Sequence, residues 1–352
     1  MASFLHAVGT AVPDHDVHPI FLDWAANRLA GSRDERLFAR MAGRSGIGHR
    51  WSVLPRDAPL IDAGGFYDGA MWPGTAARMA IYAEQAPALA LRAIERLGEQ
   101  VALDGITHLV VASCTGFVAP GIDQIIARRL ALPPSTERLL VGFMGCYAAV
   151  AALRSARHIV RSDPAARVLV VTVELSTLHL QQTSDLESIL AMLQFGDGAA
   201  AALVTAEPGG LAIGQPFATT LADSQDLIRW AITDHGFVMH LSGEVPGRIA
   251  DALADPAFAA AATGGHAPSD IDGWAVHAGG RSILDAVERA LALPPTALAA
   301  SRSVLADNGN MSSATLMFVL ARLLAGPPVQ RGVALAFGPG LAAEGFSFGS
   351  AP

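Results

Sequence analysis

The sequence predicts an α/β fold in which helices cover both faces of the sheets. Two observations lead to this prediction. Short segments that are apolar almost throughout alternate with amphipathic helical patterns, and the same order of segments occurs twice in the 352-residue chain. Continuously apolar strands are typical of sheets buried on both faces. The composition agrees, because 51% of the residues are hydrophobic and 16% are charged, which suffices for a large core.

The first copy of the repeated order begins with an apolar strand predicted over residues 107–114. A helical pattern follows over 121–130 and leads into Ala-Leu-Pro-Pro at 131–134, where proline ends the helix. A further apolar run meets Gly-Cys at 145–146, and the alanine-rich pattern after it predicts a helix. The next apolar strand is predicted over 167–173. This first half therefore has the character of a βαβ unit.

The second copy has the same order of elements. A strand is predicted over 273–277 and a helix over 281–290, followed by Ala-Leu-Pro-Pro at 292–295. Gly-Asn at 309–310 then opens a helix, and an apolar strand is predicted over 332–337. One shared tetrapeptide could arise by chance, but the recurrence of the whole order makes chance a poor explanation.

The repeat predicts how the chain is organised. We expect two similar halves, residues 1–210 and 211–352, packed about a pseudo-twofold axis. The two Gly-X helix starts would then face each other, and Cys146 and Asn310 would share one cavity. Outside the repeat, residues 75–97 predict a long amphipathic helix, and the Pro- and Gly-rich stretch 52–74 predicts an irregular loop.

Charge and composition exclude several classes of function. A net charge of −8 disfavours nucleic-acid binding, which needs a basic field. The eleven histidines and two cysteines show no metal-ligand spacing, and no phosphate-loop or dinucleotide fingerprint occurs. Two cysteines indicate a reducing compartment. Neither a signal peptide nor a membrane span is expected, so we predict a cytoplasmic protein without membrane insertion.

Three residues could form a nucleophilic site. Cys146 stands at a helix start, where unpaired N–H groups and the helix dipole lower a thiol pKa. His277 ends a strand before Ala-Gly-Gly, and Asn310 stands at the other helix start. Each has a plainer interpretation as a small buried hydrophobe, a structural histidine or a helix cap. Together they offer a nucleophile, a base and an amide donor that could hold an oxyanion.

The residues around this site form ordered motifs. They are Gly145-Cys146-Tyr147-Ala148, His277-Ala278-Gly279-Gly280-Arg281-Ser282, Gly309-Asn310-Met311-Ser312-Ser313-Ala314 and Phe337-Gly338-Pro339-Gly340-Leu341. In this order they resemble the type III polyketide synthases, the chalcone synthase-like family of the thiolase superfamily, and in particular its bacterial members. The similarity extends over nearly the whole chain.

The resemblance implies a fold and a reaction. It implies a homodimer of five-layered αβαβα thiolase-like subunits that need no cofactor beyond their CoA thioester substrates. An acyl-CoA starter would load on Cys146 and be extended with malonyl-CoA by decarboxylative condensation. The chain would then cyclise to a pyrone, resorcinol or phloroglucinol-type product. His277 would form an ion pair with the thiolate and, with Asn310, hold the thioester carbonyl.

The resemblance also implies a substrate cavity and a CoA site. Phe195 and Met239 fall at two gatekeeper positions, and the unbranched methionine suits a flexible aliphatic chain. Further cavity positions fall on Cys114, His179 and Trp230. For Cys114, a structural role and a role in cyclisation remain equally open. CoA phosphates would meet Arg40 and Arg44, four apart on one helix face, and pantetheine would meet Gly279, Gly280 and Ser282.

Other classes of protein fit the sequence less well. An initiating ketoacyl-acyl-carrier-protein synthase shares the three residue types, but it reads His-Gln-Ala-Asn and Gly-Asn-Thr-Ser where this chain has His-Ala-Gly-Gly and Gly-Asn-Met-Ser. A non-catalytic acyl-CoA-binding protein on the same fold would have no need of all three. A redox role for Cys146 lacks a neighbouring resolving cysteine in the sequence.

Overall fold

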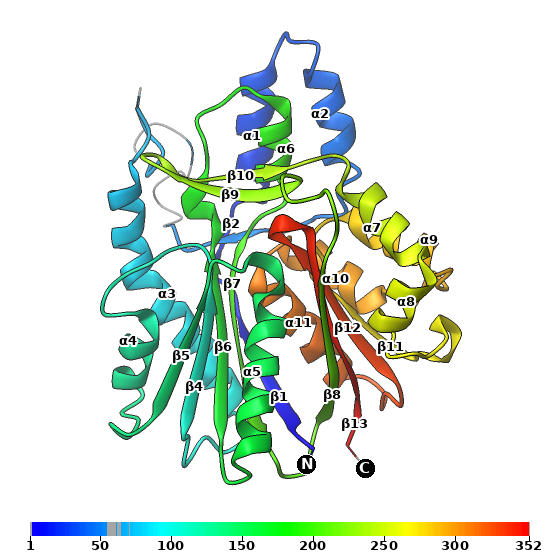
Figure 1. The fold of residues 1–352 in the computed structure, drawn as a ribbon. Coiled ribbons are helices and arrows are strands. Elements are labelled where there is room, and N and C mark those ends of the chain that lie inside the picture. Colours follow the sequence, from blue (N-terminus) through cyan, green and yellow to red (C-terminus); the bar gives the residue numbers. More distant parts are fainter. Residues whose placement is uncertain (1, 55–60, 62–64, 70, 352) are drawn as a thin grey trace.

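The computed structural model describes residues 2–54, 61, 65–69 and 71–351. Most of the predicted loop 52–74 is therefore described, but 55–60, 62–64 and 70 lie outside the described residues. Within the described part, nine strands form one mixed sheet in the order β11-β12-β13-β8-β1-β7-β6-β4-β5 (Figure 1). These strands are β1 (Phe4–Ala11), β4 (His108–Ser113), β5 (Glu137–Gly142), β6 (Val168–Leu175), β7 (Asp197–Thr205), β8 (Leu211–Thr220), β11 (Gly273–Val276), β12 (Gly332–Gly338) and β13 (Ala342–Ser350).

Two small sheets and a set of helices complete the fold. The small sheets pair β2 (His15–Asp16) with β3 (Trp51–Ser52), and β9 (Ile228–Thr233) with β10 (Gly236–Leu241). The helices are α1 (His18–Leu29), α2 (Glu35–Ala42), α3 (Thr75–Gly98), α4 (Ile122–Arg129), α5 (Ala148–Ser162), α6 (Leu186–Met192), α7 (Val245–Ala254), α8 (Pro256–Ala262), α9 (Arg281–Ala290), α10 (Ala299–Asn308) and α11 (Ser313–Leu324).

Strand directions divide the large sheet into two halves of like topology. In one half, β4 lies parallel to β6, and β7 and β1 follow antiparallel. In the other half, β11 lies parallel to β12, and β13 and β8 follow antiparallel. The halves join where β1 and β8 pair through Phe4 with Ala212 and Leu5 with Leu211. The internal repeat predicted from the sequence is therefore confirmed as a repeat of topology.

Three clusters of buried hydrophobic side chains lie between the five layers of the fold. One cluster lies between α3 and α4 and the outer faces of β4, β6 and β7. The central cluster surrounds α5 and α11, which run between the two halves of the sheet (Figure 1). The third packs α7, α9 and α10 on the outer faces of β11 and β12. Along β4, Leu109 and Val111 face the first cluster, while Val110 and Ala112 face the central one. This is the predicted thiolase-like αβαβα arrangement.

The repeated Ala-Leu-Pro-Pro segments have the same backbone structure. Ala131 and Ala292 have φ values of 51° and 49°. The N–H groups of Leu132 and Leu293, the residues that follow them, donate to carbonyls five residues earlier, at 3.0 and 2.9 Å. These contacts close helices α4 and α9 in the same way, by a left-handed residue that satisfies the last carbonyls. The prolines that follow prevent either helix from continuing.

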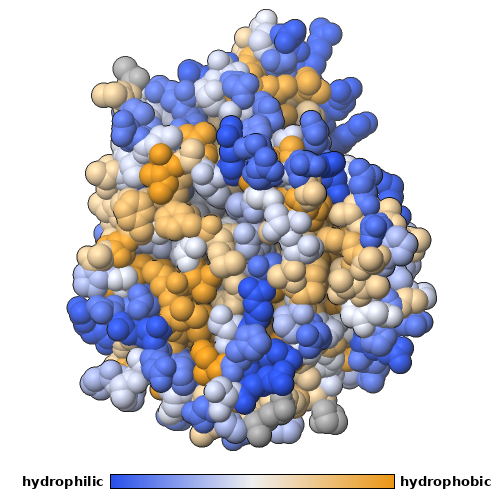
Figure 2. All heavy atoms as spheres, in the orientation of Figure 1, coloured by the Kyte–Doolittle hydropathy of each residue, from blue (hydrophilic) through white to orange (hydrophobic). Residues whose placement is uncertain are grey.

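The edge strand β5 presents apolar side chains to the surface. Leu139 and Leu140 are 42% and 47% exposed, and Phe117 and Phe143 beside them are 52% and 50% exposed. Figure 2 shows hydrophobic side chains gathered over this edge of the sheet. An exposed edge of this kind is typical of an interaction surface.

Candidate active site

Cys146 lies at the start of the central helix α5. One turn of 3₁₀ helix, Gly145–Tyr147, precedes the α-helix, and the thiol residue is 7% exposed. Gly145 has a φ of 70°, and a Cβ there would lie 2.5 Å from Pro339 Cδ. Only glycine fits this turn without displacing a neighbour. The tight turn thus fixes the direction in which the following thiol points.

Asn310 lies beside the thiol, three residues before the first residue of the matching helix α11. Its Nδ2 donates to the Gly279 carbonyl at 3.2 Å, and its Oδ1 accepts from the Ser312 backbone N–H at 2.8 Å. Ser312 and Asn310 both lie close enough to the Cys146 thiol to favour its charged form and so to oppose the rise of its pKa. The structure therefore brings the two Gly-X helix starts together, as the repeat predicted.

His277 is joined to Asn310 through Gly279. The Gly279 N–H donates to the His277 carbonyl at 2.9 Å, while the Gly279 carbonyl accepts from Asn310. The imidazole is 2% exposed, and neither ring nitrogen has a hydrogen-bond partner among the described residues. A buried polar ring without partners is costly, which is typical of a group that waits for a substrate or a proton.

Burial keeps both the thiol and the imidazole neutral in the resting site. It raises the pKa of Cys146 to about 12, although Ser312, Asn310 and the residue's own N–H favour the thiolate. It also lowers the pKa of His277 to about 3. The expectation that the helix start lowers the thiol pKa is therefore wrong for the resting site, because desolvation outweighs the dipole. Transfer of the proton from the thiol to the imidazole would create two charges that stabilise each other.

A buried carboxylate that the sequence analysis missed contacts Cys114 and lies close enough to Cys146 to influence its thiol. Glu174, at the end of β6, accepts from the Cys114 N–H at 3.0 Å, the Thr115 hydroxyl at 2.9 Å and the Ser313 hydroxyl at 2.5 Å. The Cys114 thiol also donates to Glu174, at 3.3 Å, and lies 3.2 Å from the Ser312 hydroxyl. Burial raises the pKa values of Glu174 and Cys114. The one available signal was a charge within an otherwise apolar strand.

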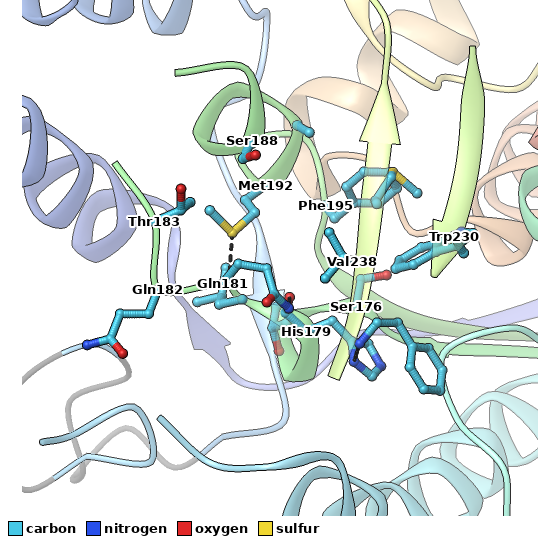
Figure 3. A pocket seen from close by; sticks show the side chains of 15 residues that line it. Ser176, His179, Gln181, Gln182, Thr183, Ser188, Met192, Phe195, Trp230 and Val238 are labelled. Atoms are coloured by element: carbon cyan, nitrogen blue, oxygen red, sulfur yellow. Dashed lines mark hydrogen bonds between the residues drawn. The ribbon is translucent and has the colours of Figure 1, made fainter. Parts of the chain in front are cut away.

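A cavity of about 260 Å³ lies between η2 (Ser176–His179), α6 and the β9–β10 hairpin. Figure 3 shows side chains from these elements pointing into it. Phe195, Met239, His179 and Trp230, all predicted to line a cavity, lie in its wall, whereas Cys114 does not. The catalytic candidates do not line it in the described structure either, so the thiol lies outside this cavity.

Phe195 connects the cavity wall with the catalytic candidate Asn310. Its side chain is 8% exposed and lines the cavity, and its backbone forms a parallel bridge with Asn310. The Asn310 N–H donates to the Gln194 carbonyl at 2.8 Å, and the Gly196 N–H donates to the Asn310 carbonyl at 3.0 Å. One short segment therefore carries both a wall of the cavity and a support of the site.

Both ring nitrogens of His179 form hydrogen bonds with the backbone. One ring nitrogen, Nε2, lies 2.6 Å from the Thr115 carbonyl, so it carries the proton, and Nδ1 accepts from the Phe237 N–H at 3.1 Å. The ring stacks on Phe237 at 4.2 Å, and burial lowers its pKa to about 3. His179 therefore shapes the cavity as a neutral ring and is not available as a general base.

Four of the five predicted CoA residues lie at the N-terminal end of α9. Gly279 and Gly280 are buried before the helix, and Ser282 is exposed in its first turn. Arg281 Nη1 donates to the Arg44 carbonyl at 3.3 Å, which brings the second basic position to this end. The expected shared helix face is wrong in one detail. Helix α2 ends at Ala42, so Arg40 is helical but Arg44 lies in the turn that follows.

Among residues 2–54, 61, 65–69 and 71–351, no group of three or more His, Cys, Asp or Glu side chains could hold a metal ion. No helix in the same ranges is long and apolar enough to span a bilayer.

The layered fold and the paired helix starts define a thiolase-like condensing enzyme. Models of the chalcone and stilbene synthases match the chain throughout, the N-terminal domain over residues 2–208 and the C-terminal domain over 212–352. The chain therefore belongs to the chalcone and stilbene synthase family. It is a type III polyketide synthase, an enzyme of the acyltransferase class.

Relatives and solved structures agree with this family. A Mycobacterium tuberculosis protein described as an alpha-pyrone synthesis polyketide synthase-like Pks18 is 37% identical over 286 residues, which are 77% of this chain and 72% of the relative. The crystal structure of PKS-I from the brown alga Ectocarpus siliculosus matches with a TM-score of 0.87 and 30% identity, over 99% of this chain and 98% of that one. The type III domain of Steely1 from Dictyostelium, 24% identical and covered completely, matches in fold with a TM-score of 0.89.

Proposed function

We propose that this enzyme loads an aliphatic acyl group from CoA onto Cys146, extends it with malonyl-CoA and releases a cyclised product of the pyrone class. The observations that support the proposal are that Asn310 lies close to Cys146 and that it shares the Gly279 backbone with His277. The two-half division at residues 210 and 211 is part of the proposal. It places the nucleophile in one half and its two partners in the other.

The loading step uses the neutral thiol and imidazole. His277 takes the proton of Cys146, and the thiolate attacks the carbonyl carbon of the acyl-CoA. The C–S bond to CoA breaks, CoA leaves as its thiolate, and the proton on His277 neutralises that thiolate. The acyl group remains on Cys146 as a thioester.

The extension step uses His277 and Asn310 as paired donors. Their N–H groups hold the thioester oxygen of malonyl-CoA, on which negative charge develops as CO₂ leaves. The resulting enolate carbon attacks the acyl carbonyl on Cys146, and the C–S bond to the enzyme breaks. Neither donor is acidic, so the departing carboxylate of malonate meets no fixed charge from these two residues.

The cavity supports an aliphatic starter. Its wall combines Met239, Val238 and Leu180 with the aromatic rings of Phe195 and Trp230. Flexible methionine and flat rings accommodate an alkyl chain without demanding one shape. The mycobacterial relative is described by α-pyrone synthesis, and we extend that product class to this chain. We further propose that no resident cofactor takes part.

The remaining partners follow from the surface. Arg40 and Arg44 would bind the CoA phosphates, and Gly279, Gly280 and Ser282 would contact the pantetheine arm. A second copy of the chain would cover the apolar edge at β5, which supports the expected homodimer. Burial of Leu139 and Leu140 would remove their side chains from water and pair the free edge.

One experiment tests the central proposal. The purified protein is incubated with malonyl-CoA and acyl-CoAs of graded chain length, and CO₂, acyl-enzyme and products are measured. We expect acyl mass on the peptide that contains Cys146, and pyrone products after more than one extension. Cys146→Ala should lose the acyl mass, while Cys114→Ala serves as the matched cysteine control. A single extension would indicate a ketoacyl synthase, and a folded protein that releases no CO₂ would contradict the proposal.

A further inference from the structure

The segment between α6 and β7 is held from two sides. One side is the backbone of Asn310, which bonds to Gln194 and Gly196 on either side of Phe195. The other side is a single arginine from a distant part of the chain. Arg50 Nη1 donates to the Phe195 carbonyl at 2.9 Å and to the Met192 carbonyl at 3.0 Å.

Arg50 is itself rigidly placed. Its side chain is 1% exposed, and the guanidinium carbon lies 4.5 Å from the centroid of the Phe21 ring. Nε donates to His18 Nδ1 at 3.0 Å, so His18 serves as a neutral acceptor. The backbone of Arg50 is tied down as well, because its carbonyl accepts from the Val17 N–H at 2.7 Å. The guanidinium therefore has little freedom to follow the segment if the segment moves.

Nearby carboxylates keep Arg50 positively charged, although none in the described part of the chain forms an ion pair with its guanidinium. Burial lowers the pKa of Arg50 to about 9, opposed by Asp16 and Asp197, so it stays charged at neutral pH. Its remaining nitrogen, Nη2, is buried and finds no hydrogen-bond partner in the described part of the chain. A buried, incompletely satisfied cation is weak evidence for a stabilising role. What it does provide is geometry, since Nε is held by His18 while Nη1 alone donates to both carbonyls.

We propose that Arg50 is a positioning residue that fixes the Phe195 gate between the cavity and Cys146, and thereby sets which acyl chains reach the thiol. Phe195 is the cavity-wall residue whose own backbone contacts Asn310, so a shift of the segment moves the ring and the site support together. The inference deepens the proposed function and rests on it. The residue does not touch the reacting atoms and acts through Phe195.

The deciding variant is Arg50→Lys. Lysine keeps the buried charge, but its one nitrogen cannot bond to His18 and to both carbonyls in the geometry that Nε and Nη1 provide. Arg50→Met removes the charge as well and is the stronger perturbation, and if it fails to fold, Arg50→Lys still decides. Arg157 gives a matched control. It is also buried, and its Nε donates to the Ile213 carbonyl at the contact of α5 with β8, away from the cavity.

The first readout does not depend on catalysis. The rates of alkylation of Cys146 by iodoacetamide and by N-octyl iodoacetamide are measured by peptide mass spectrometry. In Arg50→Lys we expect the ratio of the alkylation rate with N-octyl iodoacetamide to the rate with iodoacetamide to rise about tenfold. A tenfold change corresponds to about 1.4 kcal/mol, which is within the range of one hydrogen bond. Arg157→Lys should leave the ratio within about twofold of the parent, since twofold is only about 0.4 kcal/mol.

The second readout is starter selectivity, the ratio of kcat/KM for a long and a short acyl-CoA. Arg50→Lys should change this ratio by a similar factor, and the change should vanish when Phe195→Ala is combined with it. An unchanged ratio in both readouts would make Arg50 merely structural. A change that persists in the Phe195→Ala background would show that Arg50 acts by another route. If no acyl-CoA is used at all, the proposed function fails, while the alkylation ratio still tests the position of the gate.

Discussion

Replacing Gly145 with alanine tests whether the turn before Cys146 is as tight as the structure indicates. The φ of 70° places an L-residue in the left-handed region, at a cost of about 1–2 kcal/mol. The new Cβ would also lie 2.5 and 2.6 Å from Pro339 Cδ and Cγ, so the proline ring or the turn must move. Overpacking of this kind costs about 1–3 kcal/mol. Together the free energy of unfolding should fall by about 2–5 kcal/mol.

Gly31 provides the matched control. Its φ is 74°, and a Cβ there would meet no heavy atom within 4 Å. Gly31→Ala should therefore show the backbone cost of about 1–2 kcal/mol without the steric cost. The difference between the two variants isolates the contact with Pro339. Urea denaturation at one fixed protein concentration gives both values, provided that the m-values agree.

Acyl loading gives a second and more sensitive measurement. Because a displacement of about 1 Å can slow a reaction about 10²-fold, Gly145→Ala should load Cys146 far more slowly than Gly31→Ala. All 24 of the Lys and Arg residues counted in the sequence are arginine, so the chain contains no lysine. No side-chain amine can therefore take up an acyl group and add to the acyl mass that is measured. The reasoning is refuted if Gly145→Ala is no less stable than Gly31→Ala and loads as fast as the parent.

Three further predictions concern stability and assembly. Glu174→Leu should lower the free energy of unfolding in urea by about 3 kcal/mol or more, because it leaves buried donors of Cys114, Thr115 and Ser313 unpaired. Glu174→Gln keeps one acceptor and should lower it by less. Equal losses of stability in the two variants would contradict this prediction. Burial lowers the pKa values of His18, His179 and His277 to about 4, 3 and 3, so the unfolded chain binds more protons below pH 6.5. Stability should accordingly fall as pH drops from 6.5 towards 4, a dependence that melting curves measure and that His18→Gln should weaken; a flat profile would count against buried neutral histidines. Leu140→Arg should shift sedimentation towards the monomer, whereas Leu140→Met should not, and a dimer that survives the arginine would place the interface elsewhere.

The features that repeat along the chain could be predicted from the sequence. The two Ala-Leu-Pro-Pro segments and the two Gly-X helix starts mark equivalent places in the halves. Pairing them predicted that Cys146 and Asn310 meet, and the structure brings them together. Helix α3 and the strands of the repeat also lie where their apolar patterns predicted them. Periodicity works here because burial on a regular element repeats with the element.

Features that depend on single buried charges could not be predicted in this way. Glu174 and Arg50 each occur once, in segments without a partner pattern, and their contacts come from residues that are distant in sequence. The thiol pKa of Cys146 was predicted in the wrong direction for the same reason. A helix start is visible in the sequence, but the depth at which it is buried is a property of the packed layers.

The exposed edge at β5 also bears on how the protein survives before it assembles. Leu139 and Leu140 are neighbours in the strand, so their side chains point to opposite faces, and charges occur only at its first two residues, Glu137 and Arg138. A newly folded single chain therefore offers an apolar template for strand addition, the usual starting point of aggregation. Pairing with a second copy would cover this edge and protect the chain against aggregation. Dilution, which favours the single chain, would uncover the edge again.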